Sequence, residues 1–395
     1  MAYDPGKSRS RQRTATPNDV IYPGAILAVL GGGQLGRMFT LAAHSMGYKV
    51  WVLDPAAHSP AGSIAERHLQ ATYTDKDALA EIAAHCAAVT TEFENVPASS
   101  LEYLQQFIPV RPSASALGIT RDRILEKTFI QQAGLLTTPF LIITSVDDCI
   151  AACEKMALPA LMKTAQMGYD GKGQALISST DDALKHFENQ QNADCILEQI
   201  VDIKQEISVV LARNPEGVTQ CFPVGENIHV NGILDTTIVP ANINPEIEQQ
   251  AITMAISLAT TLDYVGVLAV EFFLSQGNQL LINEMAPRPH NSGHYTLDAC
   301  ITDQFEQQVR TLCGLQPGAA DLLKPVVMLN ILGDIWRNEM VPDWNTVYRH
   351  MAAKLHLYGK DKPLSGRKMG HINILSDSLS GAMETSEQIR QQLGF

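Results

Sequence analysis

Two glutamates in the second half of the chain stand in apolar segments, where a charge is costly. Glu271 lies in the run 265–274 and Glu284 ends the run 279–284. A two-residue hairpin loop at Gly277 and Asn278 places the two carboxylates directly opposite each other on one face of a sheet. Like charges in that position destabilise a sheet, and a divalent cation between them removes the repulsion. Because oxygen ligands suit Mg²⁺, the pair predicts a magnesium site; a solvent-facing pair on an edge hairpin is the alternative.

A cationic strand end and a glycine-rich segment follow each other in the middle of the chain. Lys163 ends an apolar, strand-like run, and residues 168–174 read Gly-Tyr-Asp-Gly-Lys-Gly-Gln. Glycines this close together give a mobile backbone with free amides, which suits a loop that closes over a polyphosphate. The spacing of a Walker A loop is absent. A glycine-rich surface turn is the alternative, but together with the carboxylate pair the segment favours phosphate handling.

The third motif is a run of glycines near the N-terminus. Residues 31–36 read Gly-Gly-Gly-Gln-Leu-Gly, between an apolar run and a helical stretch, and Asp54 ends the next apolar run. This pattern is typical of a dinucleotide-binding loop, in which glycines bring the backbone close to a phosphate at a helix N-terminus. The same loop serves other phosphorylated ligands or a tight turn. The motif alone therefore leaves NAD(P) binding and these alternatives open.

Alternating strands and helices must position these motifs. A strand at 26–30, where ordered structure is expected to begin, a helix at 34–46 and a strand at 49–53 form a βαβ unit. Such a unit predicts a parallel, doubly wound sheet. A helix at 120–133, closed by Gly134, is followed by a mixed region. Further strands are expected at 87–91, 158–163, 195–198, 206–212, 265–274, 279–283 and 326–332, with a helix at 246–262. The fold class is therefore α/β and α+β.

Composition and charge narrow the class of protein. Hydrophobic residues make up 45% of the 395 residues, enough for a large core, so the chain as a whole is not disordered. The net charge of −13 argues against general nucleic-acid binding. Seven cysteines without a CxxC pair favour reduced thiols, and no apolar run is long enough to span a membrane. The basic N-terminus lacks the apolar region of a secretory signal, so we expect a disordered tail over residues 1–23 of a cytoplasmic protein.

Five segments, in order along the chain, resemble the signatures of one enzyme family. They read GGGQLGRM at 31–38, TEFENV at 91–96, GYDGKGQ at 168–174, NEMAPRPHNSGH at 283–294 and GRKMGH at 366–371. Together they resemble the N5-carboxyaminoimidazole ribonucleotide synthases, ATP-dependent carboxylases of purine biosynthesis in the ATP-grasp superfamily. The resemblance covers residues 26–374, and the segment at 283–294 is far more specific than any of the glycine loops.

The resemblance implies an ATP-grasp fold in three domains. They are an N-terminal doubly wound domain at 24–122, an ATP-grasp domain with a lid at 123–314 and a small C-terminal domain at 315–395. It also implies the reaction: ATP and bicarbonate give ADP and carboxyphosphate, and the 5-amino group of aminoimidazole ribonucleotide captures the carboxyl group. The cofactors implied are ATP and Mg²⁺, with neither biotin nor NAD. A homodimer is the family expectation.

Carried over position by position, the resemblance assigns a nucleotide site. The residues implied in ATP binding are Arg123, Lys163, Gly168, Tyr169, Asp170, Gly171, Lys172, Gly173, Gln174, Glu198, Gln199, Ile200, Val201, Glu206, His229, Asn283 and Glu284. Among them, Arg123 and Lys163 match cations on the phosphates, 168–174 the lid, and 198–201 a hinge that reads adenine through its backbone. Glu206 matches the carboxylate that binds the ribose. Glu271 and Glu284 match the Mg²⁺ ligands, which agrees with the hairpin argument.

One position departs from the superfamily. Many ATP-grasp relatives have an asparagine ligand two residues after the second glutamate, where this chain has Ala286. Phosphate oxygens and water must then complete the coordination of the metal, which is common for Mg²⁺.

The remaining implied residues belong to the ribonucleotide and to bicarbonate. Gln34, Glu92, Lys360 and Arg367 are expected to bind the ribonucleotide, the last two as a clamp on its phosphate. The residues implied in catalysis are Tyr169, Asp170, Arg288, His290, Asn291 and Ser292. For His290 and His294, ordinary hydrogen bonding in a buried loop is the alternative.

Other functions stay open at this point. Formate-dependent glycinamide ribonucleotide transformylase is the nearest alternative within the superfamily, and biotin carboxylase is further away because no biotinyl carrier segment is present. An NAD(P)-dependent dehydrogenase rests on the first glycine loop and Asp54 alone and leaves the two glutamates unexplained. A non-catalytic nucleotide-binding regulator has no reason to keep both Glu271 and Glu284.

Overall fold

The structure of the chain, a computed structural model, describes residues 20–166, 168, 173–337 and 340–395. Most of the expected N-terminal tail lies outside this part. The expected start near Ile26 was too late, however, because Ile21 is buried in the core of the N-terminal domain. Its backbone N–H donates to Cys313 O at 2.9 Å, and its carbonyl accepts from the Tyr48 hydroxyl at 2.8 Å. These contacts order residue 21 and bring the chain into β1.

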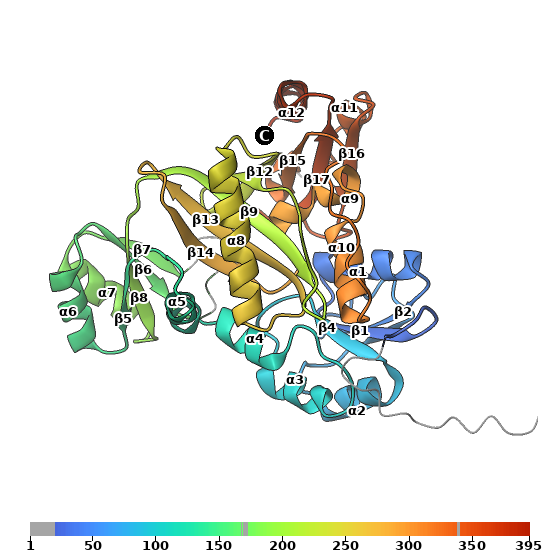
Figure 1. Ribbon diagram of the computed structural model, residues 1–395, viewed down its shortest axis with the longest axis horizontal. Coiled ribbons are helices and arrows are strands. Elements are labelled where there is room, and N and C mark those ends of the chain that lie inside the picture. The colour runs from blue at the N-terminus through green and yellow to red at the C-terminus, as the bar shows by residue number, and fades with distance from the viewer. Residues whose placement is uncertain (1–19, 167, 169–172, 338–339) are drawn as a thin grey trace, which may run out of the picture.

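A four-stranded parallel sheet forms the N-terminal domain, as the βαβ pattern predicts (Figure 1). Its order is β3-β2-β1-β4, from β1 Ile26–Leu30, β2 Lys49–Leu53, β3 Arg67–Leu69 and β4 Ala88–Thr91. The helices that cover it are α1 Gln34–Ser45, α2 Lys76–His85, α3 Ala98–Gln105, α4 Ala114–Thr120 and α10 Gln304–Leu312. Leu27 and Val29 pack with α1 and α10, whereas Ala28 and Leu30 pack with α2, α3 and α4. Because both faces are covered, β1 is apolar throughout.

A separate four-stranded antiparallel sheet lies at the left of Figure 1. Its order is β5-β8-β6-β7, from β5 Phe140–Ile143, β6 Ala160–Thr164, β7 Gln174–Ile177 and β8 Cys195–Gln199. Helices α6 Val146–Lys155 and α7 Thr180–Asn189 cover one face and share a core with Ala160 and Met162 of β6. Leu161 and Lys163 therefore point to the other face, toward the rest of the molecule.

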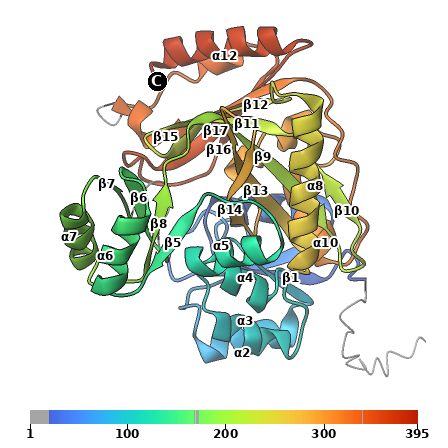
Figure 2. The same ribbon diagram turned by 60° about the vertical axis from the view of Figure 1, so that its left-hand side comes forward.

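The largest sheet is antiparallel and has nine strands, from the hairpin of the two glutamates to the C-terminal region. The strand order is β14-β13-β9-β11-β12-β15-β17-β16, and β10 pairs with β9. In chain order, the strands are β9 Ile203–Arg213, β10 Thr219–Cys221, β11 Gly225–Val230, β12 Ile233–Val239, β13 Gly266–Ser275, β14 Leu280–Ala286, β15 Val326–Leu332, β16 Ala353–Leu357 and β17 Lys368–Leu375. Helix α8 Pro245–Thr261 packs against β9 and β13, and α12 Leu379–Leu393 covers β15 and β17 (Figure 2). The strands after residue 315 thus extend the sheet that carries the glutamates.

Helix α5 Arg123–Gln132 lies between the two antiparallel sheets and contacts both β8 and β14. It begins three residues later than expected because the Asp122 side chain caps it, accepting from the N–H groups of Ile124 (2.9 Å) and Leu125 (3.2 Å). Gly134, with a φ of +73°, follows its end as expected. The same capping brings Arg123 to the first turn of the helix.

Short elements complete the described structure: η1 Asn291–Gly293, α9 Thr296–Ala299, η2 Gly333–Ile335 and α11 Asn345–Tyr348. All seven cysteines are free, as expected from their spacing. Within the described residues, no helix has the length and apolarity that crossing a membrane requires.

Candidate active site

The two glutamates of the hairpin face each other across β13 and β14, where Glu271 pairs with Glu284. The predicted two-residue loop was nevertheless wrong. Leu274 pairs with Leu280, and the connection is a three-residue turn in which Asn278 has a φ of +57°. The longer turn shifts the register by one residue, and a bulge after Glu271 shifts it back. The expected pairing therefore exists because two departures from the simple hairpin cancel.

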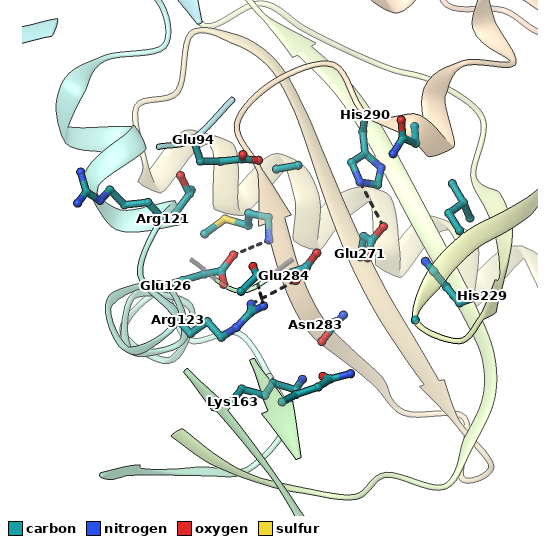
Figure 3. A pocket seen from close by; sticks show the side chains of 18 of the residues that line it. Glu94, Arg121, Arg123, Glu126, Lys163, His229, Glu271, Asn283, Glu284 and His290 are labelled. Carbon is teal, nitrogen blue, oxygen red and sulfur yellow. Dashed lines mark hydrogen bonds and ion pairs between the residues drawn. The ribbon is translucent and has the colours of Figure 1, made fainter. Parts of the chain in front are cut away.

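The bulge also shapes the site. The bulge lies on β14, where Asn283 is the extra, unpaired residue, and Asn283 and its neighbour Glu284 both line the same cavity (Figure 3). Burial, followed by repulsion from Glu284, raises the pKa of Glu271 to about 7. No group of three or more potential metal-ligating side chains occurs among the described residues. The chain thus offers two opposed carboxylates, a donor set that fits Mg²⁺ when phosphate oxygens and water supply the remaining ligands.

A cavity of about 380 Å³ lies over this pair, a volume within the usual range of small-molecule sites. Three parts of the fold form its walls. The small sheet contributes Lys163, the large sheet contributes the hairpin, and the N-terminal domain contributes Glu94. Lys368 of β17 closes another side. A ligand in this cavity therefore contacts residues far apart in the sequence.

Arg123 and Lys163 supply positive charge from two walls of the cavity. The Arg123 guanidinium contacts Glu284 (Nη1 to Oε2, 3.4 Å) and donates to the carbonyl of Gly168 (Nη2, 3.3 Å). Lys163 forms an ion pair with Glu198. Gly168 and Gln174, the two ends of the expected lid, also line the cavity. The expected lid residues Tyr169, Asp170, Gly171 and Lys172 lie outside the described residues, whereas Gly173 is described, with a φ of +73°.

Glu198 has surroundings that the hinge expectation did not foresee. Its backbone lies within β8, paired with β5 on one side and β6 on the other, and its side chain is 2% exposed. Although burial alone raises the pKa of Glu198, the ammonium groups of Lys127 and Lys163 lower it below its ordinary value. Gln199 ends β8, and Ile200 and Val201 connect it to β9. The expected backbone contact with adenine therefore fits Ile200 and Val201 better than Glu198.

Glu206 of β9 and His229 of β11 lie together on the large sheet. The Oε2 atom of Glu206 is 2.8 Å from Nδ1 of His229, and both residues line the cavity. Although burial alone lowers the pKa of His229, the hydrogen bond and charge of Glu206, with Glu271 nearby, raise it above its ordinary value. The structure thus places the two residues expected at the nucleotide next to each other.

The segment after β14 brings Arg288 and His290 into the cavity. The Nε atom of Arg288 forms an ion pair with Glu94 of the N-terminal domain at 2.7 Å. His290 is held at its backbone by the side-chain amide of Gln304, which accepts from its N–H (2.9 Å) and donates to its carbonyl (2.8 Å). Two domains therefore fix this segment, one through the arginine and one through the backbone.

The partners of the His290 ring define its protonation. Nδ1 lies 2.9 Å from Ser292 Oγ and accepts from the Ser292 backbone N–H at 3.3 Å, so we assign the proton to Nε2. Nε2 is 3.5 Å from Oε1 of Glu271. Burial, followed by the charge of Arg288, lowers the pKa of His290 well below its ordinary value. Ser208 donates in turn to Ser292 (2.9 Å). His290 is thus a neutral, oriented donor.

In the first glycine loop, two carboxylates accept hydrogen bonds from backbone N–H groups. The N–H of Gly32 donates to Oδ2 of Asp54 at 2.7 Å, and the N–H of Gly33 donates to Glu92. A Cβ atom at Gly33 would lie 2.0 Å from Oε1 of Glu92, so any side chain there would displace the carboxylate from its hydrogen bond. Burial raises the pKa of Glu92 to about 7. Because a dinucleotide phosphate needs these same amides, their occupation argues against the NAD(P) interpretation.

Next to this loop, residues from three parts of the chain meet. Gln34 donates to Oδ1 of Asn291 (3.1 Å) and accepts from Nζ of Lys360 (2.6 Å). The Lys360 ammonium also lies 5.5 Å from the centre of the Tyr358 ring. Arg367 is bonded elsewhere, to the carbonyl of Lys362 at 2.9 Å. Its expected part in a phosphate clamp stays a prediction.

Among the residues that sequence reasoning missed, the structure places Glu94, Glu126 and Lys368 in the cavity lining and Lys127 below it. Glu94 and Lys368 stand inside the segments already quoted for the family resemblance. Glu126 and Lys127 follow Arg123 by three and four positions, one helical turn, and this spacing is the signal that was available. Glu126 is buried and accepts from the N–H of Met285 at 2.5 Å. Burial, followed by the charge of Glu284, raises its pKa to about 8.

Comparison with known families accounts for these features together. The chain matches the ribonucleotide synthetase preATP-grasp domain over residues 25–121 and the ATP-grasp domain over 128–305. Residues 326–385 match the phosphoribosylaminoimidazole carboxylase C-terminal domain. The three matches follow the order of the parallel sheet, the cavity and the C-terminal strands.

Individual relatives agree with the family models. The N5-carboxyaminoimidazole ribonucleotide synthase of Bacillus subtilis (strain 168) is 43% identical over 356 residues, which cover 90% of this chain and 93% of the relative. A solved N5-carboxyaminoimidazole ribonucleotide synthetase in complex with ADP has a TM-score of 0.89 and 42% identity, covering 95% of this chain and 99% of the other.

A third relative, from Aspergillus clavatus, was solved with ADP and 5-aminoimidazole ribonucleotide. It has a TM-score of 0.86 and 27% identity, covering 96% of this chain and 99% of the other. With its glutamate pair, its cavity between two antiparallel sheets and its three matching segments, the chain belongs to the N5-carboxyaminoimidazole ribonucleotide synthase family of the ATP-grasp superfamily.

Proposed function

We propose that the protein carries out its family's reaction in the cavity between the two antiparallel sheets, using the residues described above. The protein is an ATP-dependent ligase of purine biosynthesis that makes N5-carboxyaminoimidazole ribonucleotide from aminoimidazole ribonucleotide, ATP and bicarbonate. One observation supports the placement above all. The opposed Glu271 and Glu284, the cations Arg123 and Lys163 and the neutral His290 all line one cavity (Figure 3).

In the first step, an oxygen of bicarbonate attacks the γ-phosphorus of ATP. The bond from this phosphorus to the bridging β–γ oxygen breaks, and ADP and carboxyphosphate result. Bicarbonate is a weak nucleophile, so catalysis depends on positioning and on stabilising the charge of the transferring phosphoryl group. Arg123 and Lys163 approach from two walls and are suited to this task. Glu206 and His229 are suited to hold the sugar end of the nucleotide.

Bicarbonate and its activated form belong at the segment that follows β14. Arg288 offers a guanidinium that Glu94 already orients, and His290 offers an Nε2–H that Ser292 and Ser208 fix through Nδ1. Charge-assisted hydrogen bonds of this kind favour an anion with planar oxygens. Asn291 extends from the same segment toward Gln34. It thereby joins the carboxyl site to the ribonucleotide site.

In the second step, the 5-amino group of aminoimidazole ribonucleotide forms a C–N bond to the carboxyl carbon. The bond between the carboxyl carbon and the oxygen that bridges it to phosphorus breaks, inorganic phosphate leaves with that oxygen, and the nitrogen loses a proton. The residues proposed for this substrate are Gln34, Glu92 and Lys360, with Arg367 as a second cation for its phosphate. Support comes from the bonds that join Gln34 to Asn291 and to Lys360. Through the first of these bonds, Gln34, which is expected to bind the ribonucleotide, contacts Asn291 of the segment proposed for bicarbonate.

Mg²⁺ is the proposed metal, held by Glu271 and Glu284. The raised pKa of Glu271 supports this assignment, because burial and then repulsion from Glu284 raise it, and a cation between the carboxylates offsets both. When bound with the nucleotide, the ion neutralises charge on the phosphates. We further propose that the enzyme is a cytoplasmic homodimer, which size-exclusion chromatography with light scattering tests.

An assay of ADP release tests the proposed function. We expect ADP release with ATP, bicarbonate and aminoimidazole ribonucleotide together, and a drop to background when the ribonucleotide is omitted. Biotin or NAD should make no difference. Release that depends instead on formate and glycinamide ribonucleotide would assign the chain to the transformylase alternative. Such a result would refute the proposal.

A further inference from the structure

A lysine below the cavity is buried far more deeply than is usual for its residue type. Lys127 lies one helical turn after Arg123 on α5, and its side chain is 2% exposed. Its ammonium donates to Oγ1 of Thr137 (3.0 Å) and to the carbonyl of Asn283 (3.2 Å). It also forms an ion pair with Oε1 of Glu198 at 2.5 Å. A buried lysine with these partners is held in one position, and its charge is compensated.

Lys127 shares its carboxylate with a second lysine. Oε1 of Glu198 contacts Lys127, and Oε2 contacts Lys163. The two ammoniums differ in exposure: Lys163 is 14% exposed and lines the cavity, whereas Lys127 does not line it. The three groups therefore form a row from the interior to the cavity, in the order Lys127, Glu198, Lys163, with a total charge of plus one.

The charge of this row determines what a ligand in the cavity experiences. A buried carboxylate paired with Lys163 alone cancels most of the positive charge at that point. With Lys127 behind it, Glu198 is already compensated, and the row as a whole stays cationic on its cavity side. Glu198 can then orient the Lys163 ammonium by a hydrogen bond without neutralising it. The direction of the Glu198 pKa agrees, since two ammoniums rather than one hold it ionised.

We propose that Lys127 is a positioning residue for the polyphosphate of ATP: it compensates Glu198, so that Glu198 orients Lys163 without cancelling its charge. This inference rests on the proposed function, because it takes Lys163 to face the phosphates. It adds a residue to which neither the family resemblance nor the cavity lining gives a role.

A mechanical role is the competing explanation. Through Thr137, Asn283 and Glu198, Lys127 also joins α5 to both antiparallel sheets. If this tie were its main role, its loss would shift the hinge after β8 as much as the phosphate site. Adenine and phosphate recognition would then weaken together. A charge role weakens phosphate recognition alone, and this difference decides the test.

The experiment compares four variants with the wild type: Lys127→Met, Glu198→Gln, the double variant, and Arg213→Met as a matched control. Arg213, on β9 of the large sheet, is also a buried cation; it donates to Tyr264 O (2.7 Å) and is not one of the residues that line the cavity. Calorimetry measures the Kd of ATP, and competition against ATP measures the Kd of adenosine. Thermal unfolding records whether each variant folds.

For Lys127→Met we expect ATP to bind at least about tenfold more weakly and adenosine to stay within about twofold. The double variant should return ATP affinity to within about threefold of wild type, because removing both charges restores the net charge beside Lys163. The amide oxygen that Glu198→Gln introduces still accepts a hydrogen bond from Lys163. Arg213→Met should lose stability without changing either affinity.

Three results would overturn the inference: an unchanged ATP affinity in Lys127→Met, an equal loss of ATP and adenosine, or a double variant as weak as the single one. Should Lys127→Met fail to fold, the double variant decides alone, since a mechanical tie predicts that it stays weak. None of these measurements needs the ribonucleotide or bicarbonate. Absence of ribonucleotide-dependent ADP release in the wild type would therefore count against the proposed function and not against this inference.

Discussion

Two pairs of neighbouring acidic side chains, one at the first glycine loop and one at the hairpin, have different partners. At the first glycine loop, the carboxylates of Asp54 and Glu92 accept hydrogen bonds from the backbone of Gly32 and Gly33. Asp54 also accepts from Ala56 N–H (2.8 Å) and from the Tyr73 hydroxyl (2.9 Å). The loop itself therefore satisfies the first pair.

At the hairpin, Glu271 and Glu284 face each other instead of backbone donors. Their nearest cationic or imidazole partners are Arg123 at 3.4 Å and His290 at 3.5 Å, both long contacts. Burial and mutual repulsion raise the pKa of Glu271. The comparison teaches that the partners of a carboxylate pair, rather than its presence, distinguish a pair that shapes a loop from one suited to a cation.

The largest effect is expected at the hairpin. Glu284→Gln should lower ATP turnover by about two to three orders of magnitude, because the proposed Mg²⁺ would lose one of its two protein ligands. Stability without ligands should stay equal or rise, since the repulsion with Glu271 disappears. Steady-state kinetics and urea unfolding measure the two effects. Asp54→Asn is the contrasting variant and should lose stability instead. The asparagine would meet the N–H of Gly32 either with its amide nitrogen, which cannot accept a hydrogen bond, or with a neutral oxygen, which accepts a weaker one. Normal turnover of Glu284→Gln at saturating ATP and Mg²⁺ would remove the distinction between the pairs.

The next effect concerns the ribonucleotide beside the glycine loop. Lys360→Met should raise the KM of aminoimidazole ribonucleotide by roughly two orders of magnitude, because a charge-assisted hydrogen bond to a bound phosphate is lost. The Kd of ATP should stay within about threefold, because the nucleotide is proposed to lie in the cavity over the glutamate pair, whose lining does not include Lys360. Lys354→Met is the control, a lysine of the neighbouring strand whose side chain is 60% exposed. Equal losses for both ligands would show that Lys360 serves the nucleotide.

A smaller effect concerns Glu92 and pH. Its pKa is raised from 4.5 to about 7, so between these values the folded protein holds a proton that the unfolded chain has lost. The free energy of unfolding should therefore fall as pH rises from 4.5 to 7. Although burial raises its pKa, Glu92 keeps some exposure to solvent, so we expect about 1–2 kcal/mol rather than the full value of the shift.

Urea unfolding of the wild type and of Glu92→Gln across this pH range measures the effect. In Glu92→Gln, the free energy of unfolding should not show this fall between pH 4.5 and 7. Identical pH profiles for the two proteins would mean that the loop leaves Glu92 with an ordinary pKa.

The smallest effect is expected for Tyr73→Phe. The hydroxyl is one of several donors to Asp54, so its removal should cost about 1 kcal/mol of stability. ATP turnover should not change, because the pair at the glycine loop is satisfied from within. A clear loss of ATP turnover in a variant that stays folded would instead place Tyr73 in the active site.

Local patterns in the sequence predicted the elements of the site better than their packing. The apolar run of β1 and the glycines after it predicted the parallel sheet, and the apolar neighbours of Glu271 predicted that this residue is buried. The opposition of Glu271 and Glu284 was right although the assumed turn was not, because turn length and a bulge compensate each other. Bulges depend on tertiary packing that no local pattern specifies.

Two other features lay beyond sequence reasoning for a physical reason. Lys127 reads as an ordinary polar residue of a helix, and its burial depends on two sheets that close around it. The extension of the large sheet by β15 depends on a pairing with β12 across about ninety residues of chain, and single-sequence patterns carry no information on such pairings. The division into domains at 122 and 314 accordingly stays a proposal.

The continuity of the large sheet has a consequence for shortening the chain. A protein that ended before β15 would expose the edge of β12 over residues 236–239 and uncover the apolar side chains of Val239 and Leu234. Such an edge is a template for pairing with other chains and hence for aggregation. In the full chain the outer edge belongs instead to β16, a short strand that carries Lys354 and His356. The C-terminal strands therefore cover this edge, and we expect a chain shortened before β15 to aggregate unless the edge of β12 is redesigned.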